Sequence, residues 1–144
     1  MAGNYLPDEG IMNLIRNLLA AWNDHDLERA VGFYAPEYQG LDVGQARPHR
    51  GPAGMRQMAI HYWQAFPDLH FIPEETIVEG ERVALFWLAH GTHQGKFMNI
   101  PPTGRPIQVW GVSWLTVAGG KITHALYIWD VAGLLRAIGL LPEL

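Results

Sequence analysis

The spacing of apolar residues predicts three helices in the first half of the chain. Residues 8–23 open on an acidic pair and carry apolar side chains at helical spacing: Ile11, Leu14, Ile15, Leu18 and Trp22. Asp26 is predicted to be the N-cap of a second helix, which includes Tyr34 and ends at Pro36 because proline cannot continue a helix. A third helix is predicted from Pro52 to Pro67, with an apolar face made by Met55, Ala59, Tyr62 and Phe66.

After Pro67 the pattern changes to that of β-strands. β-Branched and aromatic residues fill four segments separated by Gly or Pro: 69–78, 82–93, 106–117 and 121–130. Gly119 and Gly120 tolerate positive φ and favour a hairpin turn at 117–122, and a second turn is expected at 78–83. A short helix ending near Gly139 is expected to follow. Helices first and strands afterwards predict an α+β domain, with helices packed on one face of a curved antiparallel sheet.

The segment 82–93 is apolar on both faces of the predicted sheet. Its residues alternate between two apolar sets: Val83, Leu85 and Trp87 on one face, and Ala84, Phe86 and Leu88 on the other. A strand that is apolar on both sides is covered on both sides. The helices cover one face, and a second copy of the chain is the simplest cover for the other, so we expect a homodimer.

Composition limits the class of protein. The 144 residues, 49% of them hydrophobic, are expected to form one domain, residues 1–144, with a single core. The net charge of −4 and the lack of a Lys/Arg cluster argue against nucleic acid or membrane partners. No cysteine and no signal-peptide pattern is present, so we expect a cytoplasmic protein without disulfides. Six Trp, five Tyr and five Phe favour a pocket for a flat organic ligand, although an aromatic core explains any single ring equally well.

The sequence lacks the residues that several kinds of catalytic chemistry require. The segment 91–97 (GTHQGKF) has too short a glycine spacing for a phosphate loop, and Phe97 stands in place of its Ser or Thr. Ser113 is the single serine and lacks the second glycine of a nucleophile elbow. His90 and His93 are three residues apart on a predicted strand, which places them on opposite faces. We therefore expect neither a metal nor another cofactor, and general acid–base catalysis remains.

Two aspartates are candidates for this acid–base chemistry. Asp130 ends the last strand and shares a face with His124, where desolvation would favour the neutral acid. Asp130 also precedes VAGLLRAI and is an equally good candidate for the N-cap of that helix. Asp42 lies near the start of a predicted first strand, and a turn before Gly44 is its alternative role.

Three histidines are interpreted from their neighbours in the sequence. His49 lies beside Arg50 in a predicted loop, and both are expected to be solvated. His61 lies in the third predicted helix and is expected to pack there. His93 is a candidate either for the mouth of a pocket or for a structural bond to the backbone.

Four segments resemble SnoaL-like polyketide cyclases: GTHQGKFMNIPPTGR (91–105), WNDHDLERAVGFYAPE (22–37), FPDLHF (66–71) and IWDVAGLLRAIGLLP (128–142). In the first of them, Asn99 stands where relatives commonly have glycine. The resemblance covers nearly the whole chain. It implies the cone-shaped α+β domain of the nuclear transport factor 2-like superfamily, usually a dimer, with three N-terminal helices on the concave side of the sheet.

The resemblance also implies a reaction, which is cofactor-free ring closure of a small hydrophobic or aromatic polyketide-like substrate by an intramolecular aldol step. Asp130 occupies the place of the family's acid/base, and Tyr127 is among the side chains that could donate to substrate oxygens. Asp42, in YAPEYQGLD, is similar in spacing to the segment that bears the general base of ketosteroid isomerases.

The expected site comprises a catalytic set and a substrate-binding set. The catalytic candidates are Asp130, Asp42 and His124, and the substrate-binding candidates are Trp110, Trp114, His93, Trp63, Tyr34 and Phe97. Two alternatives stay open. One is an isomerase, dehydratase or hydrolase of a cyclic hydrophobic molecule, with Asp42 as base or partner. The other is a non-catalytic dimeric module that binds a small ligand.

Overall fold

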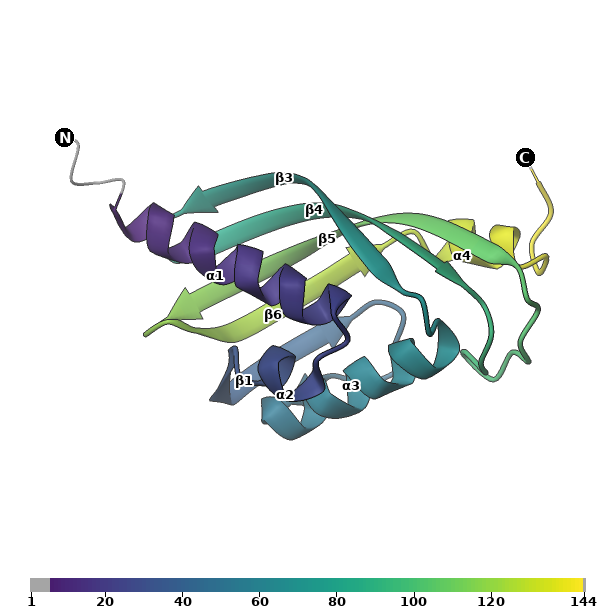
Figure 1. Ribbon diagram of the computed structural model, residues 1–144, viewed down its shortest axis with the longest axis horizontal. Coiled ribbons are helices and arrows are strands. Elements are labelled where there is room, and N and C mark those ends of the chain that lie inside the picture. The colour runs from purple at the N-terminus through teal and green to yellow at the C-terminus, as the bar shows by residue number, and fades with distance from the viewer. Residues whose placement is uncertain (1–5, 144) are drawn as a thin grey trace.

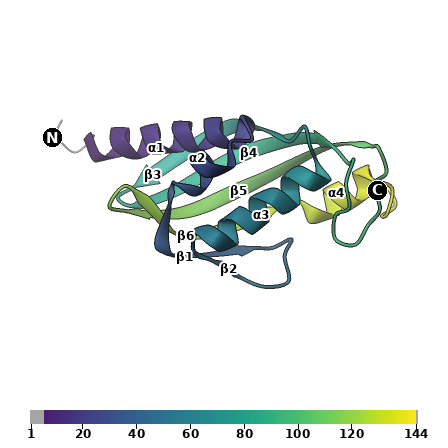
Figure 2. The same ribbon diagram turned by 60° about the horizontal axis from the view of Figure 1, so that its bottom comes forward.

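A computed structural model of the protein describes residues 6–143. Its helices are α1 (Leu6–Asn23), α2 (Leu27–Val31), α3 (Gly51–Ala65) and α4 (Val131–Ala137). Its strands are β1 (Tyr34–Asp42), β2 (His49–Arg50), β3 (His70–Glu79), β4 (Arg82–Thr92), β5 (Pro106–Ala118) and β6 (Lys121–Trp129). The predicted α+β class is confirmed, and α1, α2 and α3 lie on the same face of one curved sheet (Figures 1 and 2). Within residues 6–143, none of the helices is both long and apolar enough to span a membrane.

The six strands form one sheet in the order β2-β1-β6-β5-β4-β3. Strands β3 to β6 make the predicted antiparallel meander. In contrast, β1 pairs in parallel with β6, and Asp42 stands opposite Tyr127 in that pairing. A parallel pair needs a long connection, which residues 43–120 supply. The sheet is therefore mixed: the predicted antiparallel pairing holds for β3 to β6 and for β1 with β2, and the β1–β6 pair is parallel.

The second helix is shorter than predicted. It ends at Val31, and Tyr34 opens β1 instead of continuing the helix. Pro36 lies inside β1, in the stretch between Tyr34 and Gln39 where the register with β6 shifts, and such irregular positions tolerate proline. Asp42 is consequently the last residue of β1 and not near its start.

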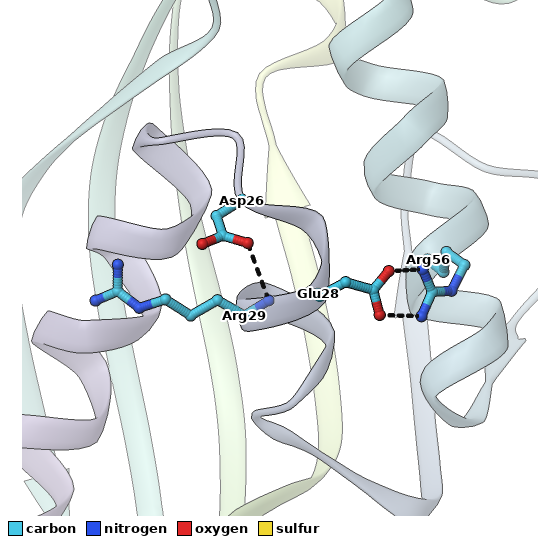
Figure 3. A network of polar contacts seen from close by, with 4 residues as sticks. All are labelled: Asp26, Glu28, Arg29 and Arg56. Carbon is cyan, nitrogen blue, oxygen red and sulfur yellow. Dashed lines mark hydrogen bonds and ion pairs between the residues drawn. The ribbon is translucent and has the colours of Figure 1, made fainter.

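Polar contacts cap the N-terminus of α2 and link α2 to α3 (Figure 3). Asp26 caps the helix as predicted, because its Oδ1 accepts a hydrogen bond from the Arg29 N–H at 3.3 Å. Glu28 of α2 accepts hydrogen bonds from both Nη atoms of Arg56 in α3, and the Nη2–Oε1 distance is 2.8 Å. This ion pair links α2 to α3, but it is exposed and screened by water, so it contributes little to stability.

Positive φ angles occur at the predicted turns. Gly80 has φ 60°, and Gly119 and Gly120 have φ 58° and 75°, which confirms the two hairpin turns. Asn99 has φ 61°. Glycine adopts this left-handed conformation most readily and asparagine is among the next best residues, which explains why either one suits this position.

The two faces of the sheet are covered differently. On β4, Leu85 and Trp87 point toward the helices and are 2% and 7% exposed. The opposite face of β4, β5 and β6 carries large apolar side chains that are 39–56% exposed: Phe86, Trp110, Trp114 and Ile128. We call the first the inner face of the sheet and the second the outer face.

Candidate functional site

A cavity of about 110 Å³ lies between the helices and the inner face of the sheet. Its walls come from α1, α3, α4 and five of the strands, and its aromatic lining residues include Trp22, Tyr34, Tyr62, Trp87, Tyr127 and Trp129. Among the described lining residues, Asp42 is the one that carries a carboxylate, and the lining contains neither His, Lys nor Arg. Within residues 6–143, no three His, Asp or Glu side chains are grouped as metal ligands.

Asp42 is 3% exposed and accepts three hydrogen bonds. Its Oδ1 accepts from the Gly44 N–H at 2.7 Å and from the Trp129 Nε1–H at 2.9 Å. Its Oδ2 accepts from the Tyr62 hydroxyl at 2.6 Å. These donors offset the cost of burying the charge. A carboxylate offers about four acceptor positions, so one remains free, and it belongs to Oδ2.

Gly44 makes this arrangement possible. A Cβ at Gly44 would lie 2.4 Å from the ring of Trp129 and 3.2 Å from Asp42 Oδ1. The lack of a side chain lets the indole approach the turn that follows β1. The Gln45 N–H donates to the Asp42 carbonyl at 2.9 Å, so Asp42 fills both the turn role and the cavity role considered for it.

Tyr62 is a neutral hydrogen-bond donor in this site. Burial raises the pKa of Tyr62 above its ordinary value, and the charge of Asp42 and the hydrogen bond to it raise that pKa further. Gln45 Nε2 donates to the Tyr62 hydroxyl oxygen at 3.3 Å. The phenol therefore keeps its proton and directs it at Asp42.

Phe97 and Trp63 lie behind the cavity wall. Phe97 is fully buried, with its ring centroid 5.5 Å from that of Tyr62 and 6.3 Å from that of Trp129. Trp63 packs edge-on against Trp22, with 5.2 Å between ring centroids. Both are next to lining residues but not among them. They hold the lining rings in place, whereas Tyr34, another of the predicted aromatic residues, lines the cavity directly.

A second polar group adjoins the cavity beside Asp42. The Tyr38 hydroxyl lies 2.8 Å from His49 Nε2 and 3.2 Å from the hydroxyl of Tyr127, which lines the cavity. His49 was expected to be solvated, but it is half-buried, because β2 pairs with β1 and brings it opposite Gly40. Burial lowers the pKa of His49, although the charge of Asp42 opposes this shift. Burial also raises the pKa of Tyr34 to about 12.

Asp130 lies outside the cavity. Its carboxylate is exposed, and Oδ1 accepts a hydrogen bond from the Gly133 N–H at 2.8 Å as the N-cap of α4. The face that it shares with His124 and Ile128 was expected to be desolvated, but it is the outer face of the sheet, where both neighbours are exposed. The capping interpretation is the one that the structure supports.

The remaining predicted residues also lie away from the cavity. Trp110 and Trp114 belong to the outer face and are 56% and 50% exposed. His93 is fully buried, and its Nδ1 accepts from the backbone N–H of Thr103 at 3.2 Å. His93 therefore makes the structural bond to backbone that was one of its two interpretations, and it does not line the cavity.

Two residues that hold Asp42 were not among the predicted site residues. Tyr62 had a sequence signal, because it belongs to the apolar face of the third predicted helix. Trp129 had a weaker one, since alternation along β6 places it on the face opposite to Asp130. Both signals show the direction of a side chain, and neither shows that the side chain meets Asp42.

The fold and the site define the class of protein. N-terminal helices that close an apolar cavity against a curved sheet are the architecture of nuclear transport factor 2-like domains, and solved structures of this fold match the chain. The chain matches the family of SnoaL-like polyketide cyclases over residues 13–138. It therefore belongs to that family, as its sequence resemblance indicated. A comparison with curated protein sequences finds no match.

Three solved structures illustrate the similarity. AclR, a proposed hydroxylase from Streptomyces galilaeus, is 28% identical with a TM-score of 0.84, over 96% of this chain and 89% of AclR. TsrD from Streptomyces laurentii is 26% identical with a TM-score of 0.82, over 92% of this chain and 97% of TsrD. IdmH, a proposed polyketide cyclase from Streptomyces antibioticus, is 28% identical with a TM-score of 0.77, over 89% of this chain and 97% of IdmH.

Proposed function

We propose that this protein is a cofactor-free acid–base enzyme that closes a ring in a small hydrophobic carbonyl compound, with Asp42 as the general base. The observation that carries the proposal is the position of Asp42, a buried carboxylate with one free acceptor position in the wall of an apolar cavity. Family membership supports cyclase or isomerase chemistry of this kind. Asp130 has no catalytic role in the proposal, because its carboxylate caps α4.

The proposed reaction begins with removal of a proton from a carbon next to a carbonyl. Asp42 Oδ2 takes this proton, and the resulting enolate carbon attacks a second carbonyl of the same molecule to form the new carbon–carbon bond. The protonated Asp42 then returns the proton to the new alkoxide. The apolar walls contribute by holding the two reacting carbons close together, which is a large part of catalysis in such intramolecular steps.

Tyr62 and Trp129 are positioning residues in this scheme. Together with the Gly44 N–H they fix both oxygens of Asp42 and leave the free position of Oδ2 for the substrate proton. A base held in one orientation acts without first reorganising, and a positioned general base contributes about 10²–10⁴-fold to a rate.

The cavity volume limits the substrate. An engineered cavity of about 150 Å³ in another protein binds benzene, so a cavity of about 110 Å³ holds at most one small ring. A larger substrate requires movement of the wall side chains. We therefore expect the smallest aromatic and alicyclic ketones to be the best first probes.

The experiment follows deuterium incorporation into the methyl group of acetophenone by NMR in D₂O. Wild-type protein is expected to accelerate the exchange. Asp42→Asn is expected to lower the rate of exchange by about a hundredfold or more, because an amide does not act as a base. Asp130→Asn is the matched control and should retain it. Exchange that depends on Asp130 and not on Asp42 would contradict the proposal.

Ring closure is tested separately from proton removal. A diketone whose carbonyl carbons are separated by three carbons closes to a six-membered ring, and chromatography detects the cyclic product. Formation of that product supports the cyclase. Exchange without ring closure favours the isomerase alternative, and ligand binding without either reaction favours the binding module.

We also propose that two copies of the chain pair through their outer sheet faces. Exposed Trp110, Trp114 and Ile128 form an apolar surface there, and surfaces of this kind mark interaction sites. Trp110→Glu is expected to convert a dimer into a monomer in sedimentation velocity. Leu140→Glu is the control, because Leu140 is 52% exposed but lies beyond α4. A wild-type monomer would contradict this proposal and leave the proposed reaction unaffected.

A further inference from the structure

The group formed by Tyr38, His49 and Tyr127 has no part in the proton transfer described above. Tyr127 lines the cavity, and it stands opposite Asp42 in the parallel pairing of β1 with β6. Paired residues of neighbouring strands project from the same face, so the two side chains enter the cavity side by side. A hydroxyl beside the base is well placed to meet the oxygen of the same substrate carbonyl.

The chain leaves space for this group at Gly40. A Cβ at Gly40 would lie 2.2 Å from the Tyr38 hydroxyl oxygen and 2.4 Å from His49 Nε2. Any side chain there would displace one of the two hydrogen-bonding atoms. Gly40 therefore permits the Tyr38–His49 contact in the same way that Gly44 permits the Trp129–Asp42 contact.

His49 sets the direction of the hydrogen bonds. Its Nδ1 is buried and has no hydrogen-bond partner. If Nε2 accepted from Tyr38, the neutral ring would carry its proton on Nδ1 as a buried unpaired N–H, and orphaned N–H groups are rarer than orphaned acceptors. The favoured arrangement has Nε2–H donating to Tyr38, and the Tyr38 hydroxyl donating to the oxygen of Tyr127. The hydrogen of Tyr127 then points away from Tyr38, toward the side of the cavity where the Tyr34 hydroxyl also lies, and a ligand oxygen there can accept it.

From this arrangement we infer that Tyr127 binds the substrate oxygen that becomes negatively charged when Asp42 removes the proton, and that Tyr38 and His49 position the Tyr127 hydroxyl. The inference rests on the proposed function. The proton moves from carbon to Asp42, the electron pair of the broken C–H bond moves onto the carbonyl oxygen, and Tyr127 donates a hydrogen bond to that oxygen without giving up its proton. Such a donor acts on charge that develops in the transition state. Burial raises the pKa of Tyr127 well above its usual value, which keeps the phenol protonated.

The test uses para-nitrophenol, because its phenolate resembles the charged enolate oxygen and its ionised form absorbs visible light. Asp42→Asn mimics the protonated base that faces the enolate, so this variant is expected to bind the phenolate more tightly than wild type. In the Asp42→Asn background, Tyr127→Phe is expected to weaken phenolate binding by about tenfold or more, the usual loss for a hydrogen bond to a charged group. Nitrobenzene, which lacks the hydroxyl, should keep its affinity and thereby report an intact cavity.

Positioning is tested by Gly40→Ala and Tyr38→Phe. Both are expected to weaken phenolate binding less than Tyr127→Phe does, again without changing the affinity for nitrobenzene. Unchanged phenolate affinity in Tyr127→Phe overturns the inference, and so does a loss that appears in Tyr34→Phe instead. These binding affinities can be measured without catalytic turnover. If phenolate binding depends on Tyr127 but wild type does not accelerate deuterium exchange, only the proposed reaction is contradicted. If wild type accelerates exchange but phenolate binding does not depend on Tyr127, only the oxygen-binding role is contradicted.

Discussion

Two aspartates stand at the ends of neighbouring parallel strands in very different surroundings. Asp42 ends β1, is 3% exposed and accepts hydrogen bonds from Gly44, Tyr62 and Trp129. Asp130 follows β6, is exposed and caps α4 through the N–H of Gly133. The difference comes from the face of the sheet that each side chain occupies.

This comparison shows how one residue type acquires two functions. On the inner face, the carboxylate is held by the nearby Gly44 N–H and by two side chains from distant segments, and it faces an apolar cavity, where an acid or base is most useful. On the outer face, the carboxylate meets solvent and the nearest unsatisfied donors, which are the N–H groups at the start of a helix. Four predictions test this separation between the two faces.

The largest effect is expected at alkaline pH, which favours ionisation of several buried inner-face tyrosines at once. The pKa of Tyr34 is raised to about 12, and the pKa values of Tyr38, Tyr62 and Tyr127 are raised above their usual value, each mainly by burial. A folded pKa above the unfolded value of about 10 gives stability that is complete below pH 10 and is lost as the pH rises. Each group contributes up to about 1.4 kcal/mol per pH unit to this loss.

Urea unfolding between pH 8 and pH 11.5 measures this loss of stability. Tyr34→Phe should reduce the slope of the unfolding free energy against pH by the equivalent of up to one bound proton. If these tyrosines ionise near pH 10 in the folded protein, seen as tyrosinate absorbance without loss of stability, their hydroxyls are not buried as described.

The second prediction compares the aspartates directly. Asp42→Ala leaves three donors without their charged acceptor and is expected to lower the free energy of unfolding by about 3–5 kcal/mol. Asp130→Ala removes one N-cap and should cost about 1 kcal/mol. Urea unfolding at pH 7 measures both values. A smaller loss for Asp42→Ala than for Asp130→Ala would show that the inner carboxylate is strained rather than stabilised.

The third prediction changes the glycine beside each aspartate. Gly44→Ala places a methyl group against the Trp129 ring and is expected to cost about 1–3 kcal/mol, as overpacking does. A Cβ at Gly133 would lie 2.2 Å from Asp130 Oδ2, a side-chain end that can move into solvent. Loss of that cap, about 1 kcal/mol, is offset by the better helix propensity of alanine, so Gly133→Ala should be nearly neutral. Thermal unfolding of both variants is the measurement, and equal losses would remove the distinction.

The smallest effect is expected at mildly acidic pH. Burial lowers the pKa values of His49 and His93, so the folded state binds fewer protons than the unfolded state. Stability should therefore fall as the pH drops below about 6.5, by at most about 1.4 kcal/mol per pH unit for each histidine. His49→Gln and His93→Gln should each flatten the dependence between pH 7 and pH 5 in urea unfolding. An unchanged slope in the double variant would assign the dependence to other groups.

Much of the local structure could be predicted from the sequence, because it depends on neighbours along the chain. Asp26 caps α2, Gly119 and Gly120 make a turn, and Asp130 was recognised as a candidate cap. The end of α2 was missed, since helical spacing continues past Val31 although the backbone does not. Propensity is a weak guide at element ends, where tertiary pairing with another strand decides the conformation.

The candidate site was predicted less well than the fold. Asp42 and Tyr34 line the cavity, whereas Trp110, Trp114 and His124 lie on the outer face. Alternation along β5 and β6 correctly grouped the residues that share a face. It could not show which face is enclosed, because both faces of these strands carry large apolar side chains.

The sequence by itself determined the helices, the meander and the alternation of side chains along each strand. The tertiary structure alone decided which side of the sheet is closed and what meets Asp42. Its partner Trp129 is 87 positions away along the chain and Tyr62 comes from another element, α3. The physical reason is that periodicity is a property of one segment, whereas the parallel pairing of β1 with β6 joins segments far apart in the chain and depends on the packing of the whole domain.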